Sequence, residues 1–351
     1  MPSSSYGYEG PSGGTIQVKA ARAYPITAHT TDVRIEQVEI PAPGPGEVLV
    51  QITAAGVTRL DHSVAAGGPS AMGLLPLTLG SEGAGLVVAD PGGRWASGTR
   101  VMFFAGDGGV TADGTMAEFA VVPARNLAAI PVSVSDEVAA AVPIAYLTGL
   151  LALRAGAFEP GMCVFAPGVG GSVGNATVQL ARALGAAAVA GGVGTTAKAE
   201  AIRAAPWARG IRIVDLERDR LRDGLGDGFP GGVDVAVDGV GGPVTAQIAA
   251  AMAPGGHLVL VGCSGGHSTE LPLCEVIERR TTLHGFSLRA ATSARSRAAW
   301  TDITELLATG RISPVIDSIY PLEAVGEALR HLVEDRPVGK VVITGLSSPR
   351  R

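Results

Sequence analysis

The chain has 351 residues, 46% of them apolar and only 4% aromatic, and its 27 basic and 32 acidic side chains give a net charge of −5. This length allows two domains with separate cores, and the apolar content excludes an intrinsically disordered protein. No basic run is interleaved with aromatic residues, which excludes a nucleic-acid surface. The longest apolar run, 138–153, is interrupted by Pro143 and Gly149 and is too short for a membrane span.

The cysteine pattern points to a reducing compartment. The three cysteines, Cys163, Cys263 and Cys274, are odd in number and widely spread, so they form no disulfide framework, and none belongs to a CxxC pair. Residues 1–14 are polar, show no signal-peptide pattern and are expected to be disordered. We therefore expect a cytoplasmic protein.

The first part of the chain is predicted to be β-rich. Short strand patterns are separated by glycine and proline, and helical patterns are scarce. The predicted strands are residues 15–24, 33–40, 48–52, 85–89, 100–104 and 116–122. This spacing predicts a unit of about a hundred residues, partly closed like a barrel.

Further along, strand and helix patterns alternate, which predicts a doubly wound parallel sheet. Residues 136–153 are apolar and helical. The strands that follow are predicted at 163–166, 186–190, 211–214, 233–237, 257–261 and 281–286. The helices between them are predicted at 172–184, 196–205, 243–252 and 273–279.

A glycine-rich turn joins the first of these strands to the first of these helices. Gly168, Gly171 and Gly174 are three residues apart, and the helix begins at Ser172 and Val173. A strand, a tight glycine turn and a helix together direct free backbone N–H groups at a phosphate. We expect these five residues to bind a dinucleotide. Gly171 would allow the pyrophosphate to approach the backbone, and Gly174 would allow close packing of helix on strand.

The C-terminal tail carries a helix pattern at 293–309, a strand at 315–320, a helix at 322–334 and a last strand at 341–344. This tail is too long to be an appendage. We expect part of it to return to the first domain.

Nine segments in the right order resemble the medium-chain dehydrogenase/reductase superfamily, in its zinc-free quinone oxidoreductase (zeta-crystallin-like) branch. They include PAPGPGEVLVQITAAGV (41–57), LPLTLGSEGAG (75–85), GTMAEFAVVPA (114–124), VDVAVDGVGGP (233–243) and VGKVVITG (338–345). The resemblance implies a GroES-like catalytic domain (15–145 plus 288–351) and an inserted Rossmann domain (146–287). It further implies an interdomain active site, a nicotinamide cofactor, a small-molecule substrate, and commonly a homodimer.

The resemblance also bears on metal binding. Zinc-dependent members have a Cys and a His where this chain has Thr58 and Ser81, and the lobe with four cysteines is missing between Met102 and Ala117. Hydroxyl groups are poor zinc ligands beside thiolate and imidazole, and Glu82 could not hold the metal alone. We expect no metal, with Thr58 and Ser81 lining the substrate pocket.

Cofactor preference is expected at the end of the second Rossmann strand. An acid there would favour NAD, and the segment 190–198 has none. Thr195 and Lys198 fall on the Ser and Lys that contact the 2′-phosphate in NADP-dependent relatives, although a solvated lysine opening a helix is the alternative. A hydroxyl and an ammonium suit a phosphate. We therefore expect NADPH as the cofactor. Changing Lys198 to Glu should then raise the Michaelis constant for NADPH.

Other expected cofactor contacts rest on the resemblance. They are Thr148 near the nicotinamide, Gly262 and Cys263 after the fifth strand, and Phe286 and Ser287 after the sixth. Ordinary packing remains the alternative for Cys263 and Phe286. The adenine-covering aromatic of some relatives is replaced by Leu216.

Without a metal to polarise a carbonyl, hydride transfer is easier to a quinone, an enone or an enoyl thioester, which spread the charge. We therefore expect an NADPH-dependent reductase, and the Ala/Gly/Arg-rich composition suits a biosynthetic tailoring enzyme. Proton delivery could come from water or from a pocket acid. No catalytic acid can be transferred from this branch, and the positions to inspect are Tyr146 and Asp61, with a structural role as the alternative for each. The alternative is a fold member that has lost net redox chemistry and binds or cyclises a reactive substrate.

Overall fold

The computed structural model describes residues 17–24, 32–67, 75–291 and 293–346. The predicted disordered segment 1–14 lies outside the described residues. The chain divides into two compact units, the first comprising Met1–Pro143 with Ile316–Arg351 and the second comprising Ile144–Val315.

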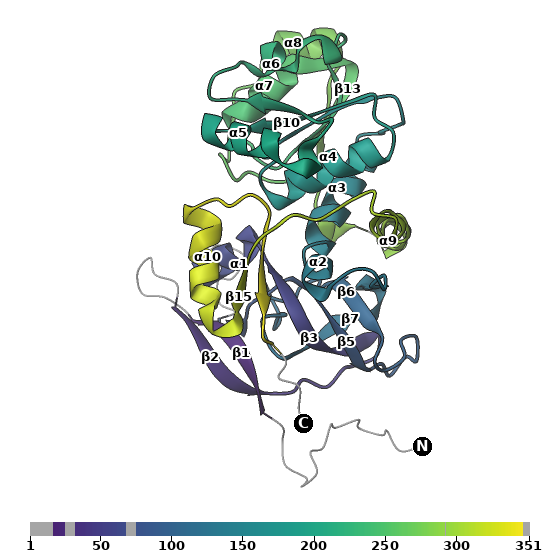
Figure 1. Ribbon diagram of the computed structural model, residues 1–351, viewed down its shortest axis with the longest axis vertical. Coiled ribbons are helices and arrows are strands. Elements are labelled where there is room, and N and C mark those ends of the chain that lie inside the picture. Colours follow the sequence, from purple (N-terminus) through teal and green to yellow (C-terminus); the bar gives the residue numbers. More distant parts are fainter. Residues whose placement is uncertain (1–16, 25–31, 68–74, 292, 347–351) are drawn as a thin grey trace. The chain divides into compact units, whose positions relative to one another are not determined.

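The first unit is built on two β-sheets (Figure 1). One has the order β2-β1-β4, and the other has the order β15-β16-β3-β5-β6-β8 with β7 also paired to β3. Its strands are β1 (Gln17–Tyr24), β2 (Asp32–Glu39), β3 (Glu47–Val57), β4 (Leu77–Thr78), β5 (Glu82–Ala89), β6 (Arg100–Phe104), β7 (Phe119–Pro123), β8 (Leu127–Ala129), β15 (Ile316–Pro321) and β16 (Lys340–Thr344). The β-rich prediction is confirmed, and the predicted strand at 100–104 coincides with β6.

Strand β3 is the centre of this unit. It is much longer than the predicted 48–52, because it pairs with β5, β7 and β16 along its length. Val48, Val50 and Ile52 are fully buried in the core. Burying apolar side chains of this size stabilises the fold by about 1.5–3 kcal/mol each.

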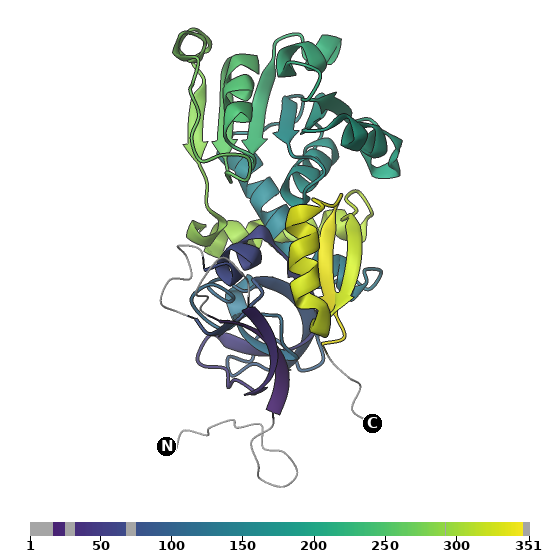
Figure 2. The same ribbon diagram turned by 90° about the vertical axis from the view of Figure 1, so that its left-hand side faces the viewer.

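The end of the chain belongs to the first unit. Strand β16 pairs antiparallel with β3, and β15 pairs parallel with β16. Helix α10 (Val325–Glu334) packs beside this strand pair, as Figure 2 shows in yellow. Ala328 and Leu329 of α10 bury their side chains in the core. The unit also contains the helices α1 (Arg59–Ala65) and α2 (Asp136–Ala140).

The second unit contains a six-stranded parallel sheet with the order β11-β10-β9-β12-β13-β14. This is the strand order 3-2-1-4-5-6 of dinucleotide-binding folds. Its strands are β9 (Cys163–Pro167), β10 (Ala188–Val193), β11 (Arg212–Asp215), β12 (Val233–Asp238), β13 (Met252–Leu260) and β14 (Thr282–Gly285). The doubly wound prediction is confirmed.

Helices cover both faces of this sheet. On one face Phe165 and Ala236 pack in a core with Leu221 and Ile248 of the crossover helices. Side chains alternate along a strand, and on the other face Val235 lies within contact distance of Gly156, just after α3. The helices are α3 (Pro143–Ala155), α4 (Ser172–Ala183), α5 (Thr196–Ala204), α6 (Leu221–Leu225), α7 (Pro243–Ala251), α8 (Leu273–Arg279) and α9 (Ser293–Ala308).

The two compact units divide the chain later than the predicted domain boundary at 287/288. Residues 288–315, including α9, belong to the second unit. Three side-chain contacts hold them there: Arg154 pairs with Asp302, Arg311 donates to the carbonyl of Ala183, and Gln179 bonds to Ser313 at 2.8–2.9 Å. These contacts join residues more than a hundred positions apart, so the sequence pattern does not show them.

The helical stretches predicted within 136–153 are two helices, α2 and α3, separated at Ala141 and Val142. Pro143 begins α3, because a proline has no N–H to donate and fits the first turn of a helix. No helix among the described residues is long and apolar enough to cross a membrane.

We predict that His331 stabilises the first unit only while it is protonated. Its Nε2 lies 2.8 Å from Asp317 Oδ2 and its Nδ1 lies 2.7 Å from Asp335 Oδ2. The hydrogen bond to Asp317 and then that to Asp335 raise the pKa of His331. The stabilisation is therefore complete below the unfolded-state pKa of about 6.5 and is lost as the pH rises through the folded-state value.

Substituting His331→Asn should lower the free energy of unfolding by about 0.5–1 kcal/mol at pH 5.5 and by less at pH 9. Urea unfolding at the two pH values measures this. An equal loss at both would contradict the assignment.

Candidate functional site

The glycine turn has the predicted strand–turn–helix geometry. Strand β9 ends at Pro167, Gly168 has a positive φ of 64°, and Gly171 is the extended N-cap of α4. Val169 is fully buried, and its N–H donates to the Gly192 carbonyl at 3.1 Å. The turn therefore lies against the neighbouring strand β10.

Gly174 is required by close packing. A β-carbon there would lie 2.5 Å from the Gly168 carbonyl oxygen and 2.7 Å from that of Pro167. At Gly171 a β-carbon would approach only the Gly168 oxygen, at 3.3 Å. The geometry supports the packing role predicted for Gly174, and the pyrophosphate role of Gly171 stays a prediction.

The start of α4 fits a phosphate. Gly171 has no side chain, so it makes no side-chain cap, and the N–H groups of Ser172, Val173 and Gly174 lie in the first turn. The first N–H groups of a helix have no partner within the helix, and its dipole is positive at that end. A pyrophosphate is the natural acceptor for such a group of donors.

Thr195 and Lys198 lie together at the start of α5. Thr195 is the N-cap, and its hydroxyl accepts a hydrogen bond of 3.4 Å from the Lys198 N–H. The hydroxyl hydrogen of Thr195 is left to donate elsewhere. This capping hydrogen bond fixes the position of Thr195 relative to Lys198, the two predicted phosphate contacts.

An acid that the sequence reading missed lies at the same helix start. Glu217 follows β11, and its Oε2 accepts from the Thr196 N–H at 2.8 Å. Asp215, which is nearly buried, accepts from the Thr196 hydroxyl at 2.7 Å and from the Glu217 N–H at 3.1 Å. The sequence prediction concerned the end of the second strand, whereas these two carboxylates lie at the end of the third strand and just after it.

The carboxyl ends of β13 and β14 carry the other predicted contacts. Gly262, Cys263 and Ser287 are exposed and Phe286 is half-buried. The Phe286 N–H donates to the Leu260 carbonyl at 2.9 Å. Because parallel strands end at one edge, these residues share the sheet edge of the glycine turn, and their contact with a cofactor stays a prediction.

Two predicted residues lie on α3. Thr148 is 7% exposed, and neighbouring Gly149 lets α3 pack on Thr177 of α4, where a β-carbon would lie 3.1 Å from the hydroxyl. Tyr146 is 2% exposed, its hydroxyl reaches no partner among the described residues, and burial raises its pKa far above the ordinary value. A phenol in such surroundings is poorly placed to exchange protons.

In the first unit, Thr58, Asp61 and Ser81 form a hydroxyl–carboxyl cluster. Asp61 Oδ2 accepts from the N–H and the hydroxyl of Thr58, both at 2.7 Å, and its Oδ1 accepts from the Ser81 hydroxyl at 3.2 Å. The two hydroxyl oxygens are 3.4 Å apart. Asp61 and Ser81 are fully buried, whereas Thr58 is half-buried.

Burial raises the pKa of Asp61 to about 6, although the Thr58 hydrogen bonds and the charge of Lys340 act in the opposite direction. Thr58 also accepts from the Asp61 N–H at 3.1 Å, which completes a capping box at the start of α1. The hydrogen bonds therefore hold the Asp61 carboxyl in place. Of the two residues whose hydroxyls bond to it, only Thr58 is partly exposed.

Beside this cluster, Glu82 pairs with Lys340 from β16. Their side chains are 0% and 4% exposed. Gly56 makes room for the pair, because a β-carbon there would lie 2.7 Å from Glu82 Oε1 and 2.8 Å from Lys340 Cε. The ammonium of Lys340 balances the carboxylate of Glu82.

These residues do not fit a zinc ion. At the positions of the Cys and His ligands the chain offers hydroxyls bonded to Asp61, and Glu82 is neutralised by Lys340. Zinc in proteins takes thiolate, imidazole and free carboxylate ligands. Across the described parts of the chain, no group of three or more His, Cys, Asp or Glu is arranged to hold a metal ion.

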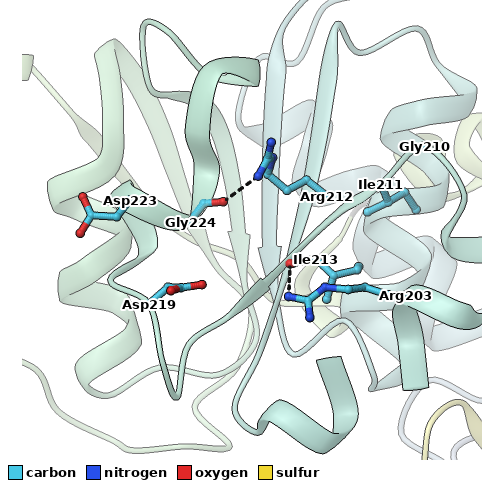
Figure 3. A pocket seen from close by; sticks show the side chains of 8 residues that line it. All are labelled: Arg203, Gly210, Ile211, Arg212, Ile213, Asp219, Asp223 and Gly224. Atoms are coloured by element: carbon cyan, nitrogen blue, oxygen red, sulfur yellow. Dashed lines mark hydrogen bonds between the residues drawn. The ribbon is translucent and has the colours of Figure 1, made fainter. Parts of the chain in front are cut away.

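A cavity of about 610 Å³ lies elsewhere, beside the start of the edge strand β11 (Figure 3). Arg203 donates to the Ile213 carbonyl at 3.0 Å and Arg212 donates to the Gly224 carbonyl at 3.3 Å. The lining residues are Arg203, Gly210, Ile211, Arg212, Ile213, Asp219, Asp223 and Gly224. None of them is a predicted site residue, so this cavity is not the candidate site.

Two family models match the chain. The one described as "Zinc-binding dehydrogenase" matches residues 212–343, and "Alcohol dehydrogenase GroES-like domain" matches residues 44–132. The human synaptic vesicle membrane protein VAT-1 homolog is 30% identical over 329 residues, covering 86% of this chain and 80% of that protein. The quinone oxidoreductase of Rattus norvegicus is 28% identical over 315 residues, covering 87% and 91%.

A solved structure of a quinone oxidoreductase has a similar fold. The quinone oxidoreductase from Thermus thermophilus, described with its complex with NADPH, has a TM-score of 0.75 and 25% identity, covering 93% of this chain and 99% of that one. The fold, the sites and these relatives together define a dehydrogenase/reductase with a GroES-like unit and a Rossmann unit. The chain belongs to the medium-chain dehydrogenase/reductase superfamily, in its quinone oxidoreductase-like branch, a family of oxidoreductases that bind a nicotinamide cofactor.

We predict that the Lys340–Glu82 pair matters for stability chiefly when one partner is lost. Replacing Lys340 by Met removes the charge that balances the buried carboxylate of Glu82 and should cost about 3–5 kcal/mol in urea unfolding. The double variant Lys340→Met with Glu82→Gln should recover much of that loss. Equal destabilisation in the single and double variants would contradict this account.

Proposed function

We propose that this chain is an NADPH-dependent, metal-free oxidoreductase that transfers hydride to a conjugated acceptor, namely a quinone, an enone or an enoyl thioester. The observation that carries the proposal is the hydroxyl–carboxyl cluster at Thr58, Asp61 and Ser81, where zinc-dependent relatives would need metal ligands. The similarity to quinone oxidoreductases supports the same acceptor class.

The cofactor, when bound, supplies the hydride. The first-turn N–H groups of α4, from Ser172 onward, would hold the pyrophosphate. The Thr195 hydroxyl and the Lys198 ammonium would bind the 2′-phosphate, which selects NADPH over NADH. The sheet-edge residues Gly262 and Phe286 and the α3 residue Thr148 would complete the contacts.

A conjugated hydride acceptor suits a site that offers hydroxyl groups in place of metal ligands. Hydride addition to an isolated ketone leaves a localised alkoxide, which a metal or a strong donor must stabilise. Addition to a quinone or an enone leaves an enolate, whose charge is delocalised within the acceptor. A site that offers hydroxyl groups, such as those of Thr58 and Ser81, is therefore sufficient for the second kind of acceptor.

The product anion then needs a proton, and Asp61 is the group we assign as its source. The Thr58 hydroxyl donates to Asp61 Oδ2 at 2.7 Å while the carboxyl is ionised. When Asp61 is protonated this hydrogen bond can reverse, so that the carboxyl donates to the half-buried hydroxyl and the hydroxyl passes its own proton to the product anion. Proton transfer by a positioned group contributes about 10²–10⁴-fold to a rate. Tyr146, the other position considered, lacks such a route.

We predict that Lys198→Glu raises the Michaelis constant for NADPH by about tenfold or more and changes that for NADH little, because a charge-assisted contact with the 2′-phosphate is replaced by repulsion. Ala201→Glu, which adds a carboxylate to the same helix without removing Lys198, is the matched control. Initial rates of cofactor oxidation measure both. Equal effects on the two cofactors would sink the assignment.

Removing the negative charge of Glu217 should have the opposite effect on NADPH binding to adding one at Lys198. Its carboxylate lies at the Thr196 N–H, near the proposed 2′-phosphate site. Substituting Glu217→Gln keeps the shape and removes the negative charge, so the Michaelis constant for NADPH should fall by a few-fold while that for NADH stays nearly constant. An unchanged NADPH/NADH ratio in the same assay would remove Glu217 from cofactor selection.

The pH dependence tests Asp61. Its raised pKa of about 6 means that the carboxyl carries a proton below that pH and loses it above, so kcat/KM should fall as the pH rises through about 6. Thr58→Val should remove this inflection because the hydroxyl is lost, and Thr58→Ser should restore it. A profile that is identical in all three proteins would exclude the relay.

The alternative function, a family member without net redox chemistry, can also be tested. Leu216 occupies the place of the adenine-covering aromatic, and its Cδ1 would lie 2.9 Å from a β-carbon at Gly192. A weaker adenine site favours a member that has lost net redox chemistry and binds or cyclises a reactive substrate. Titration of NADPH against intrinsic fluorescence separates the two, because only the reductase requires saturable binding.

We also propose a homodimer. Edge strand β14 and helix α8 carry exposed apolar side chains at Leu283, Leu273 and Ile277. Exposed apolar groups at a free sheet edge favour association with a second copy. Light scattering of the chain and of Ile277→Glu compares the assembly states directly.

A further inference from the structure

A thiol and an imidazole lie next to each other after β13. Cys263 Sγ is 3.2 Å from His267 Nδ1, and both side chains are exposed. The other two cysteines differ from this one. Cys163 is half-buried, with its thiol 3.9 Å from the Gly228 carbonyl, and Cys274 is exposed on α8.

The loop that carries the pair is held by its own backbone. The Gly266 N–H donates to the Cys263 carbonyl at 3.2 Å, and the Gly265 N–H donates to the Val240 carbonyl at 2.6 Å. The Ser264 hydroxyl donates to the Gly239 carbonyl at 3.0 Å. Cys263 and His267 therefore face each other across a turn whose middle is fixed by three hydrogen bonds, two of them to the neighbouring loop.

The neighbouring loop is equally constrained. Asp238 is fully buried, and its Oδ1 accepts from the N–H groups of Val240 and Gly241 at 2.8 and 3.0 Å. A β-carbon at Gly241 would lie 3.0 Å from Cys263 Cα, so glycine allows the two loops to meet. The pair is thus positioned before any ligand arrives, which is the requirement for an effective nucleophile and base.

An imidazole within hydrogen-bond distance can accept the proton of a thiol and leave a thiolate, the reactive form of cysteine. We propose that Cys263 and His267 form a nucleophilic pair that is alkylated by conjugated carbonyl compounds, which makes Cys263 a modification site. The inference does not rest on the proposed function, because the reaction needs only the pair and the electrophile.

The step balances without another reagent. His267 takes the thiol proton, and the Cys263 sulfur forms a bond to the β-carbon of the alkene. The π pair moves to give an enolate, and the imidazolium returns the proton, directly or through water, to the α-carbon. The product is a thioether, and neither partner is oxidised or reduced overall.

The test uses N-ethylmaleimide, itself a conjugated carbonyl compound, on the full-length protein. A brief exposure below one equivalent, followed by proteolysis and mass spectrometry, gives the rate at each cysteine. Cys263 should react at least about tenfold faster than the exposed Cys274, which is the internal control for access. The half-buried Cys163 should react most slowly.

His267→Asn preserves a hydrogen-bond acceptor and removes the base. The rate at Cys263 should then fall to about that of Cys274, whose own rate should not change; circular dichroism and thermal unfolding verify that the variant is folded. Equal rates at Cys263 and Cys274 in the unchanged protein, or an unchanged Cys263 rate in a folded His267→Asn variant, would overturn the proposal.

Discussion

Lys340 and Glu82 form an ion pair from which water is excluded, and it brings the last strand of the chain against the middle of the first unit. Removing two charges from water is costly, so the pair persists only because each charge compensates the other. Gly56 leaves the space that the two side chains fill. The pair therefore fixes both a structural junction and the electrostatic character of the neighbouring site.

The Lys340–Glu82 pair also affects the neighbouring cluster of Thr58, Asp61 and Ser81. The Lys340 ammonium balances the charge of Glu82, and burial raises the pKa of the neighbouring Asp61 to about 6. Thr58 and Ser81 bind this carboxyl and leave no strong cation ligand. Where zinc-dependent relatives would need metal ligands, this cluster offers hydroxyls and a buried carboxyl, which supports the proposal of an acceptor that delocalises charge by itself.

The sequence was sufficient for the parts of the structure that follow from local pattern. The strand–turn–helix at Gly168 and the doubly wound second sheet follow from periodicity and glycine spacing. The absence of zinc ligands at Thr58 and Ser81 follows from the family resemblance. What it missed depends on contacts between distant residues. The place of α9 depends on Arg154 with Asp302, and the carboxylate at the start of α5 comes from Glu217, which lies nineteen positions beyond Lys198.

The central claim is that reduction proceeds without a metal. The most direct measurement is elemental analysis of the purified chain, combined with the rate of NADPH oxidation by a quinone before and after treatment with a strong chelator. The account predicts less than stoichiometric zinc and an unchanged rate. One zinc per chain, with activity lost on chelation and regained on adding zinc, would contradict it.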